Sequence, residues 1–205
     1  MPTIHAATAG TRASRNPARP LRLLHALAPW PIAALIAGCA SLPTSVAEAP
    51  VPAQLNPGPG HRVVTTLHAR GVQVYECREA KDAPGRFAWA FIGPEAELFD
   101  AAQHPSGLHG AGPSWQAPDG SRIVGTVRQR ADATEPGAIP QLLLATRSEG
   151  PGGRFSNVVA VQRLNTHGGV APDSACSQAN ASQTVRVPYT ADYRMFAAMA
   201  QEDRY

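Results

Sequence analysis

The sequence predicts a single all-β domain, either an antiparallel β-sandwich or a barrel-like sheet. Between residues 61 and 197 the apolar residues recur in short runs that turn residues separate, as in a succession of strands. Few stretches are long enough, or have the right periodicity, for a helix. The dipeptide Asp119-Gly120 lies between two such runs, and it suits the tight turn of a β-hairpin. The pattern leaves the sandwich and the barrel open as alternatives.

The first expected strands lie at residues 62–67 and 72–77, on either side of a turn at Ala69-Arg70-Gly71. The next strand carries three aromatic residues that alternate with smaller ones, so that their rings share one face. We expect this face to belong to the core. The three aromatic residues are Phe87, Trp89 and Phe91.

The later elements follow from turn signals. Residues 94–99 are a strand or irregular, and residues 103–112 form a loop that contains glycine and histidine. A hairpin joins strands 114–116 and 122–127, and a polar loop over 166–183 holds Cys176. The remaining strands are expected at residues 139–146, 158–164, 184–187 and 193–196. Residues 193–199 are also compatible with a short helix.

The first 38 residues predict an export signal. They contain no acidic residue and four arginines, and an apolar stretch follows at residues 23–36. This stretch is too short for a conventional transmembrane helix, which needs about 20 residues. The arginines are Arg12, Arg15, Arg19 and Arg22.

The segment Leu35-Ile36-Ala37-Gly38-Cys39 resembles the lipobox of bacterial lipoproteins. We therefore predict that residues 1–38 are a cleaved signal peptide and that Cys39 is lipidated, which anchors the protein to a membrane. The alternative is an ordinary secretory signal with a chance cysteine. In the lipoproteins that this segment resembles, an alanine such as Ala40 after the lipidated cysteine, in place of an aspartate, favours transfer to the outer membrane. We therefore expect the protein to lie there and to face the periplasm.

The chain beyond the signal divides into three predicted parts. Residues 39–60 are a linker rich in proline, which favours an extended tether. The all-β domain covers residues 61–197, and residues 198–205 are a C-terminal tail.

The charge of the mature chain argues against nucleic acid as a partner. The full chain has 18 basic and 15 acidic residues, but four basic residues lie in the signal, which leaves 14 against 15. The apparent basicity therefore disappears with the signal peptide.

Cysteine usage predicts a disulfide. If Cys39 carries lipid, only Cys77 and Cys176 remain, in a compartment where disulfides persist. One alternative is two separately buried thiols. The other is a catalytic thiol, but the sequence has no adjacent histidine pattern that would support it.

An ordered set of motifs runs through about residues 51–196. The motifs are Gly71-Val72-Gln73-Val74-Tyr75-Glu76-Cys77, Trp89 with Phe91, Pro94-Glu95-Ala96-Glu97-Leu98-Phe99, His109-Gly110-Ala111-Gly112-Pro113-Ser114-Trp115, Asp119-Gly120-Ser121, Val161-Gln162-Arg163-Leu164-Asn165-Thr166 with Gly168-Gly169, Cys176, and Val187-Pro188-Tyr189-Thr190-Ala191-Asp192-Tyr193. Together they resemble a known family, the domain-of-unknown-function family 3455. The resemblance implies a secreted or envelope-exposed domain and carries no activity with it.

The segment from His109 to Trp115 is a candidate ligand-stacking surface, since glycine and proline shape the backbone beside an imidazole and an indole. The alternative is that Trp115 fills the core while His109 bonds a backbone carbonyl. Arg163 and Asn165 could line a polar cleft, or Arg163 could pair with Asp192 and hold the last strand. We favour the structural alternative in both cases.

Two function classes remain. The first is a non-catalytic envelope module that binds a small ligand, a glycan or a protein, or has a structural role. The second is a hydrolase or metal-dependent enzyme built around His109 and loop carboxylates. No histidine pair has metal-ligand spacing and no catalytic motif is present, so we predict no metal and no cofactor. The candidate site residues are His109, Trp115, Asp119, Arg163, Asn165 and His167.

Overall fold

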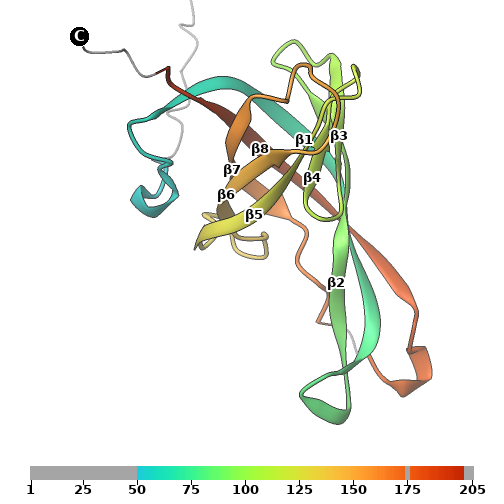
Figure 1. Cartoon of the computed structure of the whole chain (residues 1–205). Helices are drawn as coiled ribbons and strands as arrows, with labels where there is room; N and C mark the ends of the chain where they lie inside the picture. The colour runs from blue at the N-terminus through green and yellow to red at the C-terminus, as the bar shows by residue number, and fades with distance from the viewer. Residues whose placement is uncertain (1–49, 174–175, 201–205) are drawn as a thin grey trace, which may run out of the picture. The chain divides into compact units, whose positions relative to one another are not determined.

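The protein folds into a closed barrel of eight antiparallel strands, in which each strand pairs with the next and the last pairs with the first. The computed structural model describes residues 50–173 and 176–200, so the predicted lipidation of Cys39 lies outside the described residues. The all-β prediction is confirmed, and of its two alternatives the structure is the barrel (Figure 1). The elements are η1 (Ala53–Leu55), β1 (His61–Ala80), β2 (Ala83–Phe99), β3 (Pro105–Gly110), β4 (Ser114–Gln116), β5 (Arg122–Ala131), β6 (Gln141–Ser148), β7 (Val158–Gly168), η2 (Gln178–Asn180) and β8 (Thr184–Ala198).

The first and last strands are longer than predicted. No turn occurs at Ala69-Arg70-Gly71, because β1 runs through it while pairing with β2 and β8. A Cβ atom on Gly71 would lie 2.1 Å from the carbonyl oxygen of Glu95, so this glycine serves a close approach of β2. The predicted strand at residues 193–196 is part of β8, which is one strand up to Ala198, so the alternative of a short helix over residues 193–199 is wrong.

The hairpins of the middle strands match the sequence pattern better. β4 and β5 pair from Gln116 and Arg122 around the predicted turn, where Gly120 has a φ of +85°. β6 and β7 pair as expected. The predicted loop at residues 103–112 instead contains β3, which bridges β2 and β4.

One end of the barrel is closed by the connection between β6 and β7. Phe155 of this connection is fully buried, and its backbone N–H donates to Ser121 Oγ at 3.0 Å. The N–H of Arg154 donates to Asp119 Oδ2 at 2.7 Å. The turn between β4 and β5 therefore holds the side chain that fills this end.

Part of the predicted linker packs on the outside of the barrel. Leu55 of η1 is fully buried in a second apolar cluster, and its carbonyl oxygen accepts a hydrogen bond from Gln162 Nε2 at 2.7 Å. The prolines of this segment favour an extended tether, but Leu55 and Val51 pack its last part against the barrel. The cluster also contains Ala131, Leu143, Ala160, Leu164 and Phe196.

β1 and β2 project beyond the barrel as an arm, seen at the bottom of Figure 1. The register shifts where Val74 pairs with Gly93 and Tyr75 with Phe91, so that Ile92 is an extra residue. Such a bulge re-aims the side chains that follow it. Phe91 here contacts Tyr75, with 5.5 Å between ring centroids.

The predicted aromatic core face is therefore wrong. Phe91 is 54% exposed, and Phe87 and Trp89 are half-buried. These residues lie on the arm, where β1 and β2 extend beyond the barrel. Alternation placed the rings on one face correctly, but the extent of the barrel was not visible in the sequence.

The predicted disulfide is present and fastens the connection between β7 and β8 to the arm. Cys77 and Cys176 are bonded, with 5.4 Å between their Cα atoms. The backbone reinforces this attachment, because Ser182 N–H donates to the carbonyl of Cys77 at 2.8 Å, and Cys77 N–H donates to the carbonyl of Gln183 at 2.9 Å.

Replacing both cysteines by serine should lower the free energy of unfolding by about 2–4 kcal/mol, because the bond closes a loop of 99 residues in the unfolded chain. Urea unfolding of the Cys77→Ser/Cys176→Ser variant measures the loss, and wild type under a reducing agent should reproduce it. Alkylation and mass measurement of non-reduced protein should find neither thiol free. Two alkylated residues at these positions would contradict the bond.

Candidate functional site

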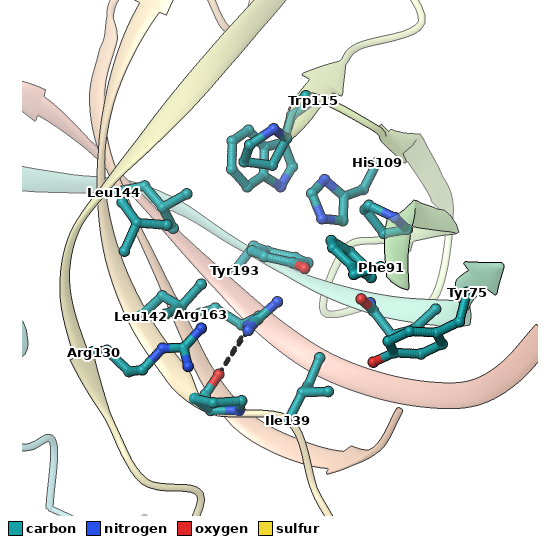
Figure 2. Close-up of a pocket in the computed structure, with 16 residues that line it drawn as sticks. Tyr75, Phe91, His109, Trp115, Arg130, Ile139, Leu142, Leu144, Arg163 and Tyr193 are labelled. Atoms are coloured by element: carbon teal, nitrogen blue, oxygen red, sulfur yellow. Dashed lines mark hydrogen bonds between the residues drawn. The ribbon is translucent and has the colours of Figure 1, made fainter. Parts of the chain in front are cut away.

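The barrel encloses a cavity of about 510 Å³ at the end from which the arm projects. This volume lies within the range of about 300–1,000 Å³ that small-molecule pockets occupy. The lining combines a buried floor with a more exposed rim (Figure 2). The floor includes His109, Trp115, Leu144 and Tyr193. The rim includes Phe91, Val127 and Arg130.

Three packed rings form the floor. Trp115 is fully buried and stacks on His109, with 4.7 Å between ring centroids and an interplanar angle of 15°. The ring centroid of Tyr193 lies 4.6 Å from that of His109 and 5.4 Å from that of Trp115. His109 Nδ1 donates to the carbonyl oxygen of Ser114 at 2.8 Å. Trp115 therefore fills the core and His109 bonds a backbone carbonyl, which is the structural alternative that we favoured from the sequence. The same three rings also line the cavity.

Burial makes His109 a neutral group. Its pKa is lowered to about 3. Removal from water is the largest cause, the hydrogen bond to Ser114 acts in the opposite direction, and the positive charge of Arg163 adds to the lowering. A general base works best with a pKa near the working pH. The ring also packs on Trp115 and Tyr193 and not on a carboxylate. Nothing in this geometry equips His109 for acid–base catalysis.

Arg163 supplies positive charge to the cavity wall. Its Nε and Nη2 donate to the carbonyl oxygen of Pro140 at 3.0 and 2.9 Å, the contact dashed in Figure 2. The predicted pair with Asp192 is wrong, because Arg163 lies opposite Tyr193 in register. Successive residues of a strand point to opposite faces, so Asp192 points out of the barrel.

The other three candidate residues lie outside the cavity. Asp119 belongs to the turn that holds the β6–β7 connection, where Ser121 also donates to it. Asn165 and His167 line a separate depression of about 270 Å³. His167 pairs there with Glu135. The structure thus brings His109, Trp115 and Arg163 together at the cavity, and Asn165 and His167 together at the separate depression.

The separate depression contains a carboxylate with two donors. Asp192 Oδ1 lies 2.5 Å from His68 Nδ1, and Asp192 Oδ2 accepts from Asn165 Nδ2 at 2.8 Å. His68 and Asp192 face each other across β1 and β8, although 124 residues separate them in the chain. Within residues 50–173 and 176–200, no group of three or more His, Cys, Asp or Glu side chains is placed to hold a metal ion.

Most of the cavity wall was not predicted from the sequence. Ile139, Leu142 and Leu144 line it, and none of them stands in one of the motifs. Alternation places Leu142 and Leu144 on one face, yet Leu143 on the other face is also buried, beside η1. Only closure of the barrel shows which face is the inner one.

The buried imidazole predicts an acid-sensitive stability. The unfolded state takes up a proton at His109 below about pH 6.5 and the native state does so only near pH 3, so stability falls as the pH falls through this window. Between pH 6.5 and 4 the loss should reach about 3 kcal/mol, at about 1.4 kcal/mol per pH unit. Urea unfolding against pH measures it.

The matched control is His109→Asn, which keeps a donor for Ser114 but does not titrate. Its unfolding free energy should change less over the same pH window. Identical pH profiles for the two proteins would contradict a depressed pKa at this position.

Comparisons with known proteins identify the family. No curated protein and no solved structure matches the chain. None of the helices in the described part of the chain is long and apolar enough to cross a membrane. The family model described as "Protein of unknown function (DUF3455)" matches residues 57–197, from the segment before β1 to the end of β8. Because this match covers well over half of the sequence, the chain belongs to the DUF3455 family.

Proposed function

We propose that this protein is a non-catalytic binding module of the bacterial cell envelope, which holds one small, mainly apolar molecule inside its barrel. The observation that carries the proposal is the cavity of about 510 Å³ with an aromatic floor and a rim at one end. Barrels of eight strands are wide enough to hold one small ligand inside. The other end is filled by Phe155, so a ligand enters and leaves through the rim.

The arrangement of polar groups favours binding over catalysis. His109 is neutral and donates to a backbone carbonyl, and Asp119 belongs to a structural turn that does not line the cavity. His68 has a carboxylate partner in Asp192. Among the described residues, however, no serine, threonine or cysteine side chain shares a hydrogen bond with His68. No observation favours the enzyme built on His109.

Attachment to the envelope is supported by two features. The segment before Cys39 resembles a lipobox, and the domain carries a disulfide, as exported proteins commonly do. We propose that acyl chains on Cys39 hold the protein on the outer membrane, facing the periplasm. The part of the linker before η1 then separates the membrane from the barrel.

The proposed cavity ligand can be tested with N-phenyl-1-naphthylamine, an uncharged apolar probe whose emission rises in apolar surroundings. Wild-type protein should bind it saturably at one site. Val127→Trp places a bulky ring on the rim and should weaken binding at least fivefold. Val127 is 47% exposed, so this change leaves the core unaltered.

Val159→Trp is the matched control, since Val159 is a 37% exposed strand residue that does not line the cavity. It should bind the probe like wild type. Absence of saturable binding, or equal effects of the two substitutions, would contradict a ligand site in the barrel.

The proposed anchor predicts that Cys39→Ala abolishes lipid-dependent processing and releases the protein from the membrane fraction. Globomycin, an inhibitor of the lipoprotein peptidase, should cause the precursor to accumulate. Ser41→Ala is the control that keeps the cysteine, and Ala40→Asp should move the protein toward the inner membrane. Fractionation and gel mobility measure these outcomes, and unchanged retention of Cys39→Ala would contradict the anchor.

A further inference from the structure

We infer that the cavity selects a molecule with a carboxylate at one end of an apolar body, and that Arg163 binds this carboxylate. The inference rests on the proposed function and names the chemical class of its ligand. It follows from the charges of the lining, the fixed position of one guanidinium and the order of groups from floor to rim.

The charge of the lining has one sign. Arg130 and Arg163 are its charged residues, and no aspartate or glutamate lines the cavity in the described structure. A half-buried cation without a carboxylate beside it attracts an anion more strongly than it would in water, because the surroundings are less polarisable. The cavity thus favours a negatively charged guest over a neutral guest of the same shape.

Arg163 is already oriented for such a guest. Two of its nitrogens, Nε and Nη2, donate to the carbonyl oxygen of Pro140, which restrains the guanidinium plane. A side-chain hydrogen bond also joins Arg163 to Tyr193, and within the described residues the lining of the cavity offers Arg163 no carboxylate. An arginine offers five N–H donors in a planar fork that matches a carboxylate. Little side-chain entropy remains to be lost on binding.

The field of this cation reaches the surrounding rings. Burial raises the pKa of Tyr75 and of Tyr193, and the charge of Arg163 acts against both shifts. It also lowers the pKa of His109. Arg163 therefore acts electrostatically on the floor as well as on the wall, with no acidic side chain in the lining to offset it.

The order of groups predicts how the molecule lies. Arg163 of β7 pairs with Leu142 of β6, and two residues further along these strands Val161 pairs with Leu144. The pair of Arg163 and Leu142 is the one nearer the rim. In Figure 2, Trp115 and His109 lie on one side of the cavity, and Arg163 and Arg130 lie on the other. The apolar body then points toward the rings, and the carboxylate stays at the level of Arg163.

A buried donor of the lining strengthens the preference for oxygen acceptors. Trp115 Nε1 is buried and has no hydrogen-bond partner within the described residues. An unpaired buried donor costs about 1–3 kcal/mol. A guest that carries oxygen atoms is the kind of molecule that could relieve this cost, whereas a pure hydrocarbon could not.

The test compares 1-naphthylacetate with its neutral isostere, 1-naphthylacetamide, by isothermal titration calorimetry at pH 7. The carboxylate should bind at least tenfold more tightly to wild-type protein. Arg163→Met should weaken 1-naphthylacetate at least tenfold and change 1-naphthylacetamide by less than twofold. Arg163→Lys, which keeps the charge without the planar fork, should fall between the two.

Arg128→Met is the matched control. Arg128 is an exposed arginine of β5 that does not line the cavity, and its removal should leave both affinities unchanged. Circular dichroism checks that each variant is folded. If Arg163→Met does not fold, the wild-type ratio of the two affinities and the Arg163→Lys variant decide.

Equal affinity of wild type for the two compounds would overturn the inference. Retained binding of N-phenyl-1-naphthylamine in the same protein would then leave the proposed function standing. A preference for the carboxylate that Arg128→Met removes and Arg163→Met does not would also overturn the role of Arg163. Failure of all three compounds to bind would overturn both proposals.

Discussion

Pairing between the first and last strands is the constraint on which the rest of the structure depends. β1 and β8 pair from His61 with Ala198 to Glu76 with Thr184. This contact turns an open sheet into a closed one and so divides every strand into an inner and an outer face. The cavity, its aromatic floor and the outward orientation of Asp192 all follow from that division. Closure also leaves some apolar side chains on the outer face of the barrel, where η1 packs against them.

Local signals were sufficient for the fold class and for the pairs β4–β5 and β6–β7. Gly120 marks a turn because the turn needs a positive φ, and a single residue carries that information. Gly71 looks similar in sequence, yet it serves the approach of Glu95 and Ala96, which are distant in the chain. Strand lengths, the position of β3 and the inner face depend on such distant partners. For that reason the candidate site was predicted only in part.

At the base of the arm, one extra residue in β2 changes which side chains face the cavity. Ile92 shifts the register, so that Phe91 lies on the same side as Tyr75 and lines the cavity. Tyr75 in turn donates to the carbonyl of Gly169 at 2.7 Å, where the connection to β8 begins. The disulfide fastens the same connection further along. The rim is thus held by strand pairing, a phenol hydrogen bond and a covalent bond that act on neighbouring segments.

The division of the cavity into floor and rim has a consequence for how this family can diversify. Trp115, Tyr193 and Leu144 belong both to the floor and to the main apolar core, so a change there alters folding and the cavity together. Phe91 and Val127 are about half exposed, and most exposed positions tolerate substitution at little cost in stability. Descendants of one ancestral barrel can therefore drift in what the rim admits while natural selection for a folded domain conserves the floor.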